Sequence, residues 1–254
     1  MKLRSLIRNV VKYTGFDLRR YRPVVCDPYL AQKYLLRSSS CRTVFDVGAF
    51  QGDVTTCYAE LFPAVEIYAF EPFPPSYEAL TDKFRANKRV HVVNAAVSSR
   101  SGEAIFHVNG IPSTNSLLPR PISGRRYFPA DAVTRETITV PTVTIDQFRR
   151  DHQVAVPDIL KMDIQGAELE ALRGADETLT SGGVSLIFAE VTFVPHYEGG
   201  VLFHQLSIYL AERGFTLFNL YDLHSANIGQ LRFGDAIFVA DRLRRSVMNE
   251  RPER

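Results

Sequence analysis

The chain has 254 residues, 45% hydrophobic and 23% charged, which is an ordinary globular composition with enough length for one α/β domain and a large core. It contains no apolar run of the roughly 18 residues that a membrane-spanning helix needs, and its three scattered cysteines argue against a disulfide framework or a zinc site and favour a reducing cytoplasm. The net charge of +2 is uneven, because residues 1–22 carry seven Lys/Arg and one Asp, so the basic character is local and gives no broad nucleic-acid footprint.

The N-terminal region, residues 1–40, is expected to be a helical extension. Residues 3–11 place five aliphatic side chains on one helical stripe with basic residues elsewhere. Such a helix could lie on an anionic membrane, peripherally at the inner membrane face. It could also pack on the domain or on a second subunit of a homo-oligomer. We favour packing, because the helix has no Trp and little bulk. A second helix is predicted over residues 28–37.

Strand and helix signals then alternate through a domain predicted to span residues 41–241. Strands are predicted at 44–47, 65–70, 90–94, 159–162, 184–191, 215–220 and 236–240, and helices at 75–86, 145–150, 167–173 and 202–212. This alternation predicts a doubly wound, mainly parallel seven-stranded sheet with helices on both faces. No helix separates the last two strands, so an antiparallel C-terminal strand is expected. Residues 242–254 are predicted to be a frayed basic tail.

A long irregular stretch, residues 109–136, interrupts this pattern between two weaker β signals at 104–108 and 137–140. It contains four Pro and two Gly. Loops of this length are usually functional or disordered. We therefore interpret it as a mobile flap over the substrate side.

The first strand and the turn that follows it predict a cofactor site. Asp46 ends the apolar run, and Gly48 and Gly52 follow in the turn, where glycine lets the backbone approach a ligand. Ligands of open α/β sheets bind beyond the carboxyl ends of the strands. Glu71 ends the second strand, where its carboxylate could accept hydrogen bonds from both ribose hydroxyls. Asn94 ends the third, where an adenine edge could be met.

Charge at the turn helps to distinguish between cofactors. In the dinucleotide fingerprint G-x-G-x-x-G, a pyrophosphate lies on the helix N-terminus. Asp46 occupies the first glycine position here, and its carboxylate would repel a pyrophosphate. S-adenosylmethionine carries an ammonium and a sulfonium and no phosphate, so it is favoured. The alternative for Asp46 is an ordinary turn or helix-capping aspartate.

A second group of polar residues follows the fourth and fifth predicted strands. Lys161 and Asp163 leave the fourth strand, which should lie beside the first, so that Asp163 projects towards the reactive end of the cofactor. Glu190 ends the fifth strand on the same rim, and His196 lies nearby. Together they form a plausible acid–base set. Glu190 could equally be structural, and a surface-loop role is favoured for His196.

These pieces together resemble the FkbM-type methyltransferases, in family order across about residues 41–240. The matching segments are VFDVGAFQG (44–52), AFEP (69–72), NAAVS (94–98), STNSL (113–117), LKMDIQGAE (160–168) and DAIFV (235–239). The resemblance implies a Rossmann-like class I methyltransferase fold and transfer of a methyl group from S-adenosyl-L-methionine to an oxygen. Family acceptors include sugar hydroxyls and polyketide-type natural products.

The resemblance also implies roles for individual residues. Those matched to the cofactor are Asp46, Gly48, Gly52, Glu71 and Asn94, and Asp163 is matched as a site residue. The further residues predicted to bind the cofactor are Phe50, Pro72, Ala95 and Ser116. Many relatives have Glu where this chain has Gln165, which weakens any metal proposal built there.

Two mechanisms remain open for the predicted carbohydrate O-methyltransferase. In the first, Asp163 takes the hydroxyl proton, helped by Glu190 or His196. In the second, Asp163 and Glu190 hold a divalent cation such as Mg²⁺, which lowers the pKa of the hydroxyl. The competing functions are an NAD-dependent sugar or alcohol oxidoreductase and a non-catalytic binding protein of the same fold.

Acceptor specificity is expected in residues 109–136 and 192–203. Phe193, Tyr197 and Phe203 could stack on a sugar ring there, or could simply pack the rim.

Overall fold

The computed structural model describes residues 26–121 and 133–248. The predicted helix at 3–11, with its membrane alternative, lies outside the described residues. The central part of the predicted flap, 122–132, lies outside them too. Within the described ranges, no helix has the length and hydropathy that crossing a membrane requires.

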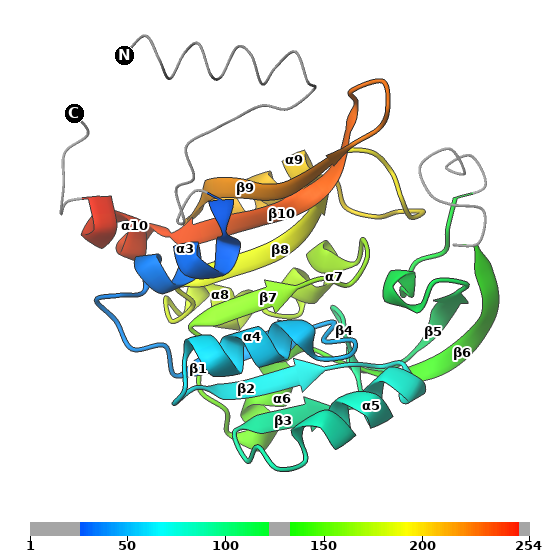
Figure 1. The fold of residues 1–254 in the computed structure, drawn as a ribbon, viewed down its shortest axis with the longest axis horizontal. Coiled ribbons are helices and arrows are strands. Elements are labelled where there is room, and N and C mark those ends of the chain that lie inside the picture. Colours follow the sequence, from blue (N-terminus) through cyan, green and yellow to red (C-terminus); the bar gives the residue numbers. More distant parts are fainter. Residues whose placement is uncertain (1–25, 122–132, 249–254) are drawn as a thin grey trace, which may run out of the picture.

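The described chain is organised around a seven-stranded sheet of order β3-β2-β1-β7-β8-β10-β9 (Figure 1). In that order the strands are β3 (Val90–Val93), β2 (Glu66–Phe70), β1 (Thr43–Val47), β7 (Ile159–Met162), β8 (Leu186–Thr192), β10 (Leu231–Ala240) and β9 (Phe215–Ser225). Neighbours from β3 to β8 are parallel, and β10 is antiparallel to both β8 and β9. The predicted sheet is confirmed, including the place of β7 beside β1.

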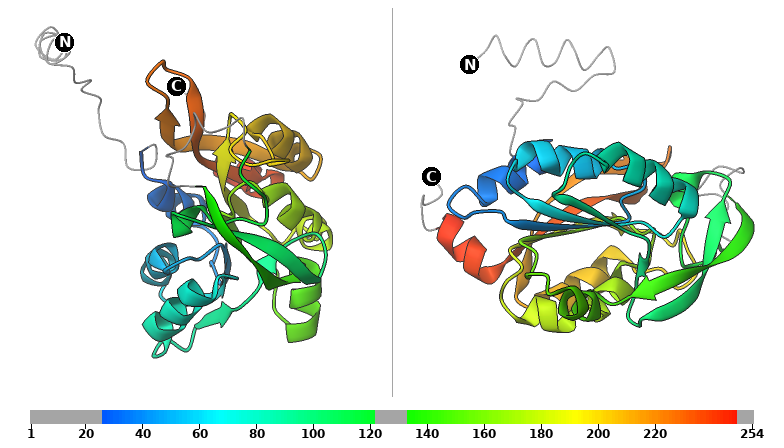
Figure 2. Two further views of the ribbon diagram at one scale, coloured as in Figure 1. Left: turned by 90° about the vertical axis from the view of Figure 1, so that its right-hand side faces the viewer. Right: turned by 90° about the horizontal axis from the view of Figure 1, so that it is seen from below.

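Helices cover both faces of this sheet (Figure 2). One face carries α3 (Pro28–Leu35), α4 (Asp53–Leu61) and α5 (Pro74–Phe84), and the other carries α6 (Ile145–His152), α7 (Glu168–Arg173), α8 (Asp176–Thr180) and α9 (Phe203–Ala211). Successive side chains of β1 point to opposite faces of the sheet, so they belong to two separate parts of the core. Phe45 and Val47 join one buried apolar cluster, and Val44 joins the other. The strand β1 therefore contributes side chains to both parts of the core.

A second, three-stranded sheet lies beyond the carboxyl ends of β1 and β2 (Figure 1). Its order is β4 (Ala96–Val97), β6 (Thr134–Val143) and β5 (Gly102–Asn109), and a short 3-10 helix, η1 (Pro112–Thr114), follows β5. The sequence predicted strands here but not a separate sheet. Because β6 begins at Thr134 and η1 is ordered, the irregular stretch is shorter than predicted.

The prediction of a frayed tail directly after Asp241 is wrong for its first part. Residues Asp241–Met248 form the helix α10. Leu243 is only 8% exposed, and Val247, one turn later, also packs on the core. An apolar pair at i and i+4 thus attaches the helix to the domain while its arginines remain available to solvent.

Candidate active site

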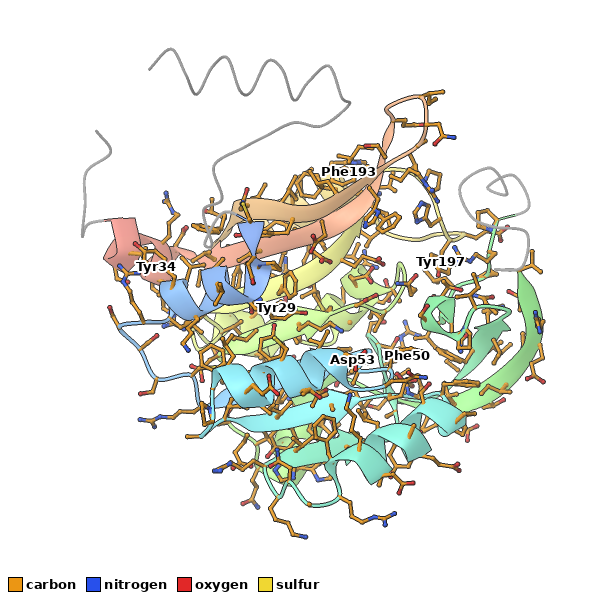
Figure 3. The ribbon with its side chains drawn as sticks, viewed as in Figure 1. Tyr29, Tyr34, Phe50, Asp53, Phe193 and Tyr197 are labelled. Atoms are coloured by element: carbon orange, nitrogen blue, oxygen red, sulfur yellow. The ribbon has the colours of Figure 1, made fainter. Side chains whose placement is uncertain are left out.

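A pocket opens at the carboxyl ends of β1, β2 and β7, between the main sheet and the small sheet. Its wall is formed by Val47, Gly48, Phe50, Phe70, Glu71, Pro72, Ala95, Ala96, Val97, Phe106, Pro112, Ser113, Asn115, Leu117, Asp163, Ile164 and Gln165. Figure 3 labels Phe50 at the end of β1 and Tyr197 across the same edge of the sheet. The pocket therefore lies where the topology of an open parallel sheet places ligands.

The turn after β1 requires glycine at position 48. Gly48 has φ +78°, and a Cβ built on it would lie 2.0 Å from the carbonyl oxygen of Asp163. The Gly48 and Ala49 amides both donate to the carbonyl oxygen of Phe70 at 3.0 Å. The turn is thus held against the ends of β2 and β7 at once.

Gly52, which the sequence assigned to the cofactor, lies at a close contact between α4 and α5. It also has a positive φ, +78°, but a Cβ there would meet Leu80 at 2.5 Å and Phe84 at 2.6 Å. Both side chains belong to α5. Gly52 therefore permits close packing of α4 on α5, and it is not among the residues that line the pocket.

Glu71 presents a buried carboxylate to the pocket. It is 5% exposed, and it accepts hydrogen bonds from the Phe50 amide at 2.8 Å and the Phe73 amide at 2.9 Å, one on each oxygen. Burial raises the pKa of Glu71, an effect partly offset by these two donors. Each oxygen keeps a lone pair, so Glu71 can accept two further hydrogen bonds from a ligand.

Asp46 and Lys161, both predicted as site residues, form a buried ion pair beneath the turn and do not line the pocket. Lys161 Nζ lies 3.0 Å from Asp46 Oδ1 and donates to the Gly48 carbonyl oxygen at 3.0 Å, while Thr55 donates to Asp46 Oδ2 at 2.6 Å. Burial lowers the pKa of Lys161, but the carboxylates of Asp46 and Asp163 outweigh it and raise the pKa overall. Lys161 therefore stays charged and serves the turn as a support.

Replacing Lys161 with methionine should destabilise the protein by about 3–5 kcal/mol, because a buried carboxylate would lose its partner. The free energy of unfolding from urea denaturation measures this. The control is Lys83→Met, whose pair with Asp53 is exposed and should change the free energy by at most about 1 kcal/mol. Equal effects of the two substitutions would contradict the supporting role of Lys161.

Asp163 and Glu190 are joined by the side chain of Gln165. Its Nε2 donates to Asp163 Oδ1 at 2.7 Å and to Glu190 Oε2 at 2.8 Å. Asp163 and Gln165 line the pocket, whereas Glu190 lies behind them. The sequence predicted that Asp163 and Glu190 share one rim, and the structure brings them together in this way.

Carboxyl groups crowd behind Asp163. Burial, followed by repulsion from Asp163 and Glu168, raises the pKa of Glu190 well above its ordinary value. Asp235, opposite Glu190 in the β8–β10 register, has its pKa raised to about 7 by burial and by Asp163. Glu190 and Asp235 therefore retain protons at higher pH than ordinary carboxyl groups do.

The side chains around Asp163 and Glu190 fit poorly the divalent cation that the second mechanism places there. Within residues 26–121 and 133–248, no three His, Cys, Asp or Glu side chains are grouped to hold a metal ion. The position between Asp163 and Glu190 is occupied by the Gln165 amide, which is a hydrogen-bond donor. Mg²⁺ needs oxygen ligands, so an N–H donor at this position fits hydrogen bonds to the two carboxyl groups better than a metal ion.

Three other predicted residues lie away from the pocket wall. Asn94 is exposed and faces a separate groove with His91 and His152. Ser116 is buried and donates to the Gln165 carbonyl oxygen at 2.9 Å. His196 packs edge-to-face on Phe233, and burial with the nearby guanidinium groups lowers its pKa to about 4. His196 therefore remains neutral and is a weak base.

The aromatic residues considered for sugar stacking pack the rim. Phe193 and Phe203 contact each other with ring centroids 5.2 Å apart, and Tyr197 is 3% exposed. The Tyr197 hydroxyl lies 2.8 Å from Gln165 Oε1 and 2.8 Å from the Thr114 carbonyl oxygen. Of the two interpretations offered by the sequence, the packing role is the one that these contacts favour.

Phe106 is a pocket residue that sequence reasoning missed. It lies on β5 and reaches the pocket because the small sheet closes over the main one. Its signal in the sequence, an apolar residue in an alternating strand, is shared by many core positions. Only the tertiary arrangement identifies it.

Comparison with known proteins gives a consistent family. The model described as "Methyltransferase FkbM domain" matches residues 46–217. The chain is 24% identical over 163 residues to the 2-O-methyltransferase NoeI of Sinorhizobium fredii, covering 61% of this chain and 65% of that protein. It is 29% identical over 126 residues to the hexuronic acid methyltransferase AglP of Haloferax volcanii, covering 49% and 46%. The chain thus spans less than two thirds of each of these relatives.

A solved structure confirms the fold. Methyltransferase FkbM from Methylobacillus flagellatus KT superposes with a TM-score of 0.51 at 16% identity, covering 85% of this chain and 48% of that one. At that identity the likeness concerns the fold alone. Together with the strand order, it confirms the predicted class I methyltransferase sheet with its antiparallel C-terminal strand.

Proposed function

This chain belongs to the FkbM methyltransferase domain family, and we propose that it transfers a methyl group from S-adenosylmethionine to a hydroxyl oxygen of a carbohydrate. The pocket at the ends of β1, β2 and β7 would hold the cofactor, and Asp163 would face the acceptor. The proposal depends on how the turn after β1 distributes its hydrogen bonds.

That turn offers a ligand a carboxylate where a dinucleotide site offers free amides. The amides of Gly48, Ala49 and Phe50 donate to Phe70 O, Phe70 O and Glu71 Oε2, and the Gly52 amide donates to the Ala49 carbonyl oxygen. In the dinucleotide fingerprint the pyrophosphate lies at this glycine turn, and here these four amides of the turn are already bonded within the protein. This observation carries the choice of S-adenosylmethionine over NAD. It replaces the sequence argument from Asp46, whose charge is neutralised by Lys161.

The pocket residues fit an adenosyl group without phosphate. Glu71 has two free lone pairs for the hydroxyls of a ribose. Ala95 and Ala96 provide small apolar wall residues beside it, where an adenine ring could lie. Asp163 lies at the other end of the turn, against Gly48. When bound, S-adenosylmethionine supplies an electrophilic methyl group.

Asp163 is the residue that we assign as the base. It lines the pocket, and its Oδ1 is oriented by the Gln165 amide, which leaves Oδ2 for the acceptor. An alcohol is a poor nucleophile until its proton is removed, so Asp163 would take that proton as the oxygen bonds to the methyl carbon and the bond from that carbon to sulfur breaks, which leaves S-adenosylhomocysteine. Because the pKa of Glu190 is raised, this carboxyl group can remain protonated beside Asp163. A protonated Glu190 carries no charge, which limits repulsion between the two groups.

Carbohydrate is the acceptor class that the relatives favour. One is named for 2-O-methylation, and the other for methylation of a hexuronic acid. A hexuronic acid is a sugar acid, and the secondary hydroxyls of a sugar have low intrinsic reactivity, which suits a site built around a positioned carboxylate. That the methyl group goes to a hydroxyl of the carbohydrate, rather than to another group on it, is part of this proposal and not of the family assignment.

The test is a transfer assay with purified protein, methyl-labelled S-adenosylmethionine and a panel of glycans and lipid-linked sugars. We expect label in at least one sugar and a thermal shift with S-adenosylhomocysteine but not with NAD⁺. Transfer should survive exhaustive EDTA treatment, because the Gln165 amide occupies the position between Asp163 and Glu190. Reduction of NAD⁺ by a sugar, or S-adenosylhomocysteine binding with no transfer to any acceptor, would support the oxidoreductase or the binding-protein alternative.

A further inference from the structure

Gln165 occupies a constrained turn between β7 and α7. It has φ +59°, a conformation that side-chain-bearing residues adopt rarely. The next residue, Gly166, has φ +98°, and a Cβ there would lie 3.2 Å from the Tyr197 ring. Tyr197 thus covers the turn closely. Backbone strain of this kind persists only where surrounding contacts maintain it.

Contacts from several elements fix Gln165 in one orientation. Its Oε1 lies 2.8 Å from the Tyr197 hydroxyl, and its backbone carbonyl accepts from Ser116 Oγ at 2.9 Å. Its Nε2 makes the two hydrogen bonds to Asp163 and Glu190 at 2.7 and 2.8 Å. A rotation of the side-chain amide would lose its bonds to Tyr197, Asp163 and Glu190 together, so the side chain has a single well-defined position, while the Ser116 bond holds the backbone.

The consequence for the two carboxyl groups is specific. One amide nitrogen supplies both of its hydrogens, one to each group, so the separation and orientation of Asp163 and Glu190 are set by a single side chain. Without it, the two groups would repel each other or recruit water. The same side chain contacts the Tyr197 hydroxyl, and the backbone carbonyl of the same residue accepts from Ser116, so Gln165 connects the two carboxyl groups to both neighbouring segments.

We propose that Gln165 is a positioning residue that aligns the Asp163 carboxylate with the acceptor hydroxyl, and that Tyr197 and Ser116 lock it in place. This inference rests on the proposed function. The inference adds that the alignment of the base, Asp163, depends on the neutral side-chain amide of Gln165. It also links the loop around Ser116 to the chemical step without any direct contact of Gln165 with the reacting atoms.

The informative variants keep the backbone conformation. Gln165→Asn retains an amide and suits a positive φ, but its side chain is one methylene shorter and cannot reach both carboxyl groups. Gln165→Glu keeps the length and replaces the donor with a carboxyl group. The matched control is Gln153→Asn, because Gln153 also has a positive φ, 54°, but is exposed at the end of α6.

We expect Gln165→Asn to lower kcat by about 100-fold, as a misplacement of about 1 Å can do, while the KM for S-adenosylmethionine stays within about twofold. Tyr197→Phe should lower kcat in the same direction but by less. Gln153→Asn should leave kcat and KM unchanged. The split between kcat and KM separates positioning from a general loss of structure.

The pH profile gives a second readout. The charged groups that act on Glu190 are Asp163, Glu168, Asp235 and Lys161, together with Arg120. The Gln165→Glu substitution adds a carboxyl group to this cluster and removes the amide donor. Both changes favour the protonated forms of the carboxyl groups in the cluster. The acidic limb of the kcat profile should therefore move to higher pH in Gln165→Glu.

Each outcome decides the inference. Wild-type transfer with an unchanged kcat in Gln165→Asn would overturn the role of Gln165 and leave the proposed function intact. A fall in kcat matched by an equal rise in KM and a lower melting temperature would also overturn it, in favour of a structural role. Wild-type protein that transfers no methyl group to any acceptor would overturn the proposed function, and this inference with it.

Discussion

Replacing Asp163 with asparagine should lower kcat for methyl transfer by about 10²–10⁴-fold, the usual contribution of a general base. Asparagine has nearly the same shape, so it can occupy the same wall position and still accept a hydrogen bond from Gln165. It cannot take a proton from the acceptor. Affinity for S-adenosylhomocysteine should change little, because Glu71, which accepts from the Phe50 amide, is the residue assigned to the ribose, while Asp163 lies against Gly48.

Single-turnover transfer of a labelled methyl group and calorimetric titration with S-adenosylhomocysteine measure the two effects of Asp163→Asn separately. Asp151→Asn is the control, because Asp151 is exposed on α6 and bonds only to Gln147 among the contacts described. Near wild-type turnover in Asp163→Asn would rule out Asp163 as the base and as a metal ligand alike.

Replacing Gly48 with alanine should abolish cofactor binding and destabilise the protein. The new Cβ would stand 2.0 Å from the Asp163 carbonyl oxygen, an atom of the backbone that cannot swing aside. A positive φ costs alanine about 1–2 kcal/mol, and overpacking adds about 1–3 kcal/mol. Relief of the clash requires β1 and β7 to separate at their ends, which opens the pocket wall.

Gly182→Ala is the matched control for this prediction. Gly182 has nearly the same φ, +74°, but a Cβ there would meet nothing within 4 Å. The difference between the two variants in the free energy of unfolding therefore isolates the close approach of Gly48 to Asp163. If Gly48→Ala bound S-adenosylhomocysteine with wild-type affinity, the turn would not be the cofactor platform.

The sheet could be predicted from the sequence because short apolar runs alternate with helical periods. That alternation places β7 beside β1, and so it places Asp163 beside Gly48. Glu71 was also predictable, since a carboxylate directly after a buried strand must lie at its carboxyl end. These inferences need only the direction of each strand, which βαβ connections determine.

Side-chain orientation was harder to predict. Asp46 and Lys161 face each other in the β1–β7 register, so each neutralises the other beneath the turn. Each stands two residues before the first residue of its turn, Gly48 or Asp163, and this equal spacing is a signal that the sequence contained. Asn94, predicted to meet an adenine edge, follows β3 and is exposed, whereas the next residue, Ala95, lines the pocket.

The small sheet and the Gln165 network depend on tertiary contacts that no local pattern specifies. Phe106 enters the pocket only because β5 pairs with β6 across a long insertion. Gln165 looked like the loss of an acid relative to the family, yet its amide joins Asp163 to Glu190. A residue that departs from a family motif can thus acquire a donor role that composition alone does not reveal.

A crystal structure of the protein with S-adenosylhomocysteine bound tests the central claim most directly. We expect both ribose hydroxyls to contact the Glu71 carboxylate, the adenine to lie against Ala95 and Ala96, and the sulfur to face Asp163 across Gly48. Binding of the ligand elsewhere, or a ribose with no contact to Glu71, would contradict the assignment of this pocket as the cofactor site.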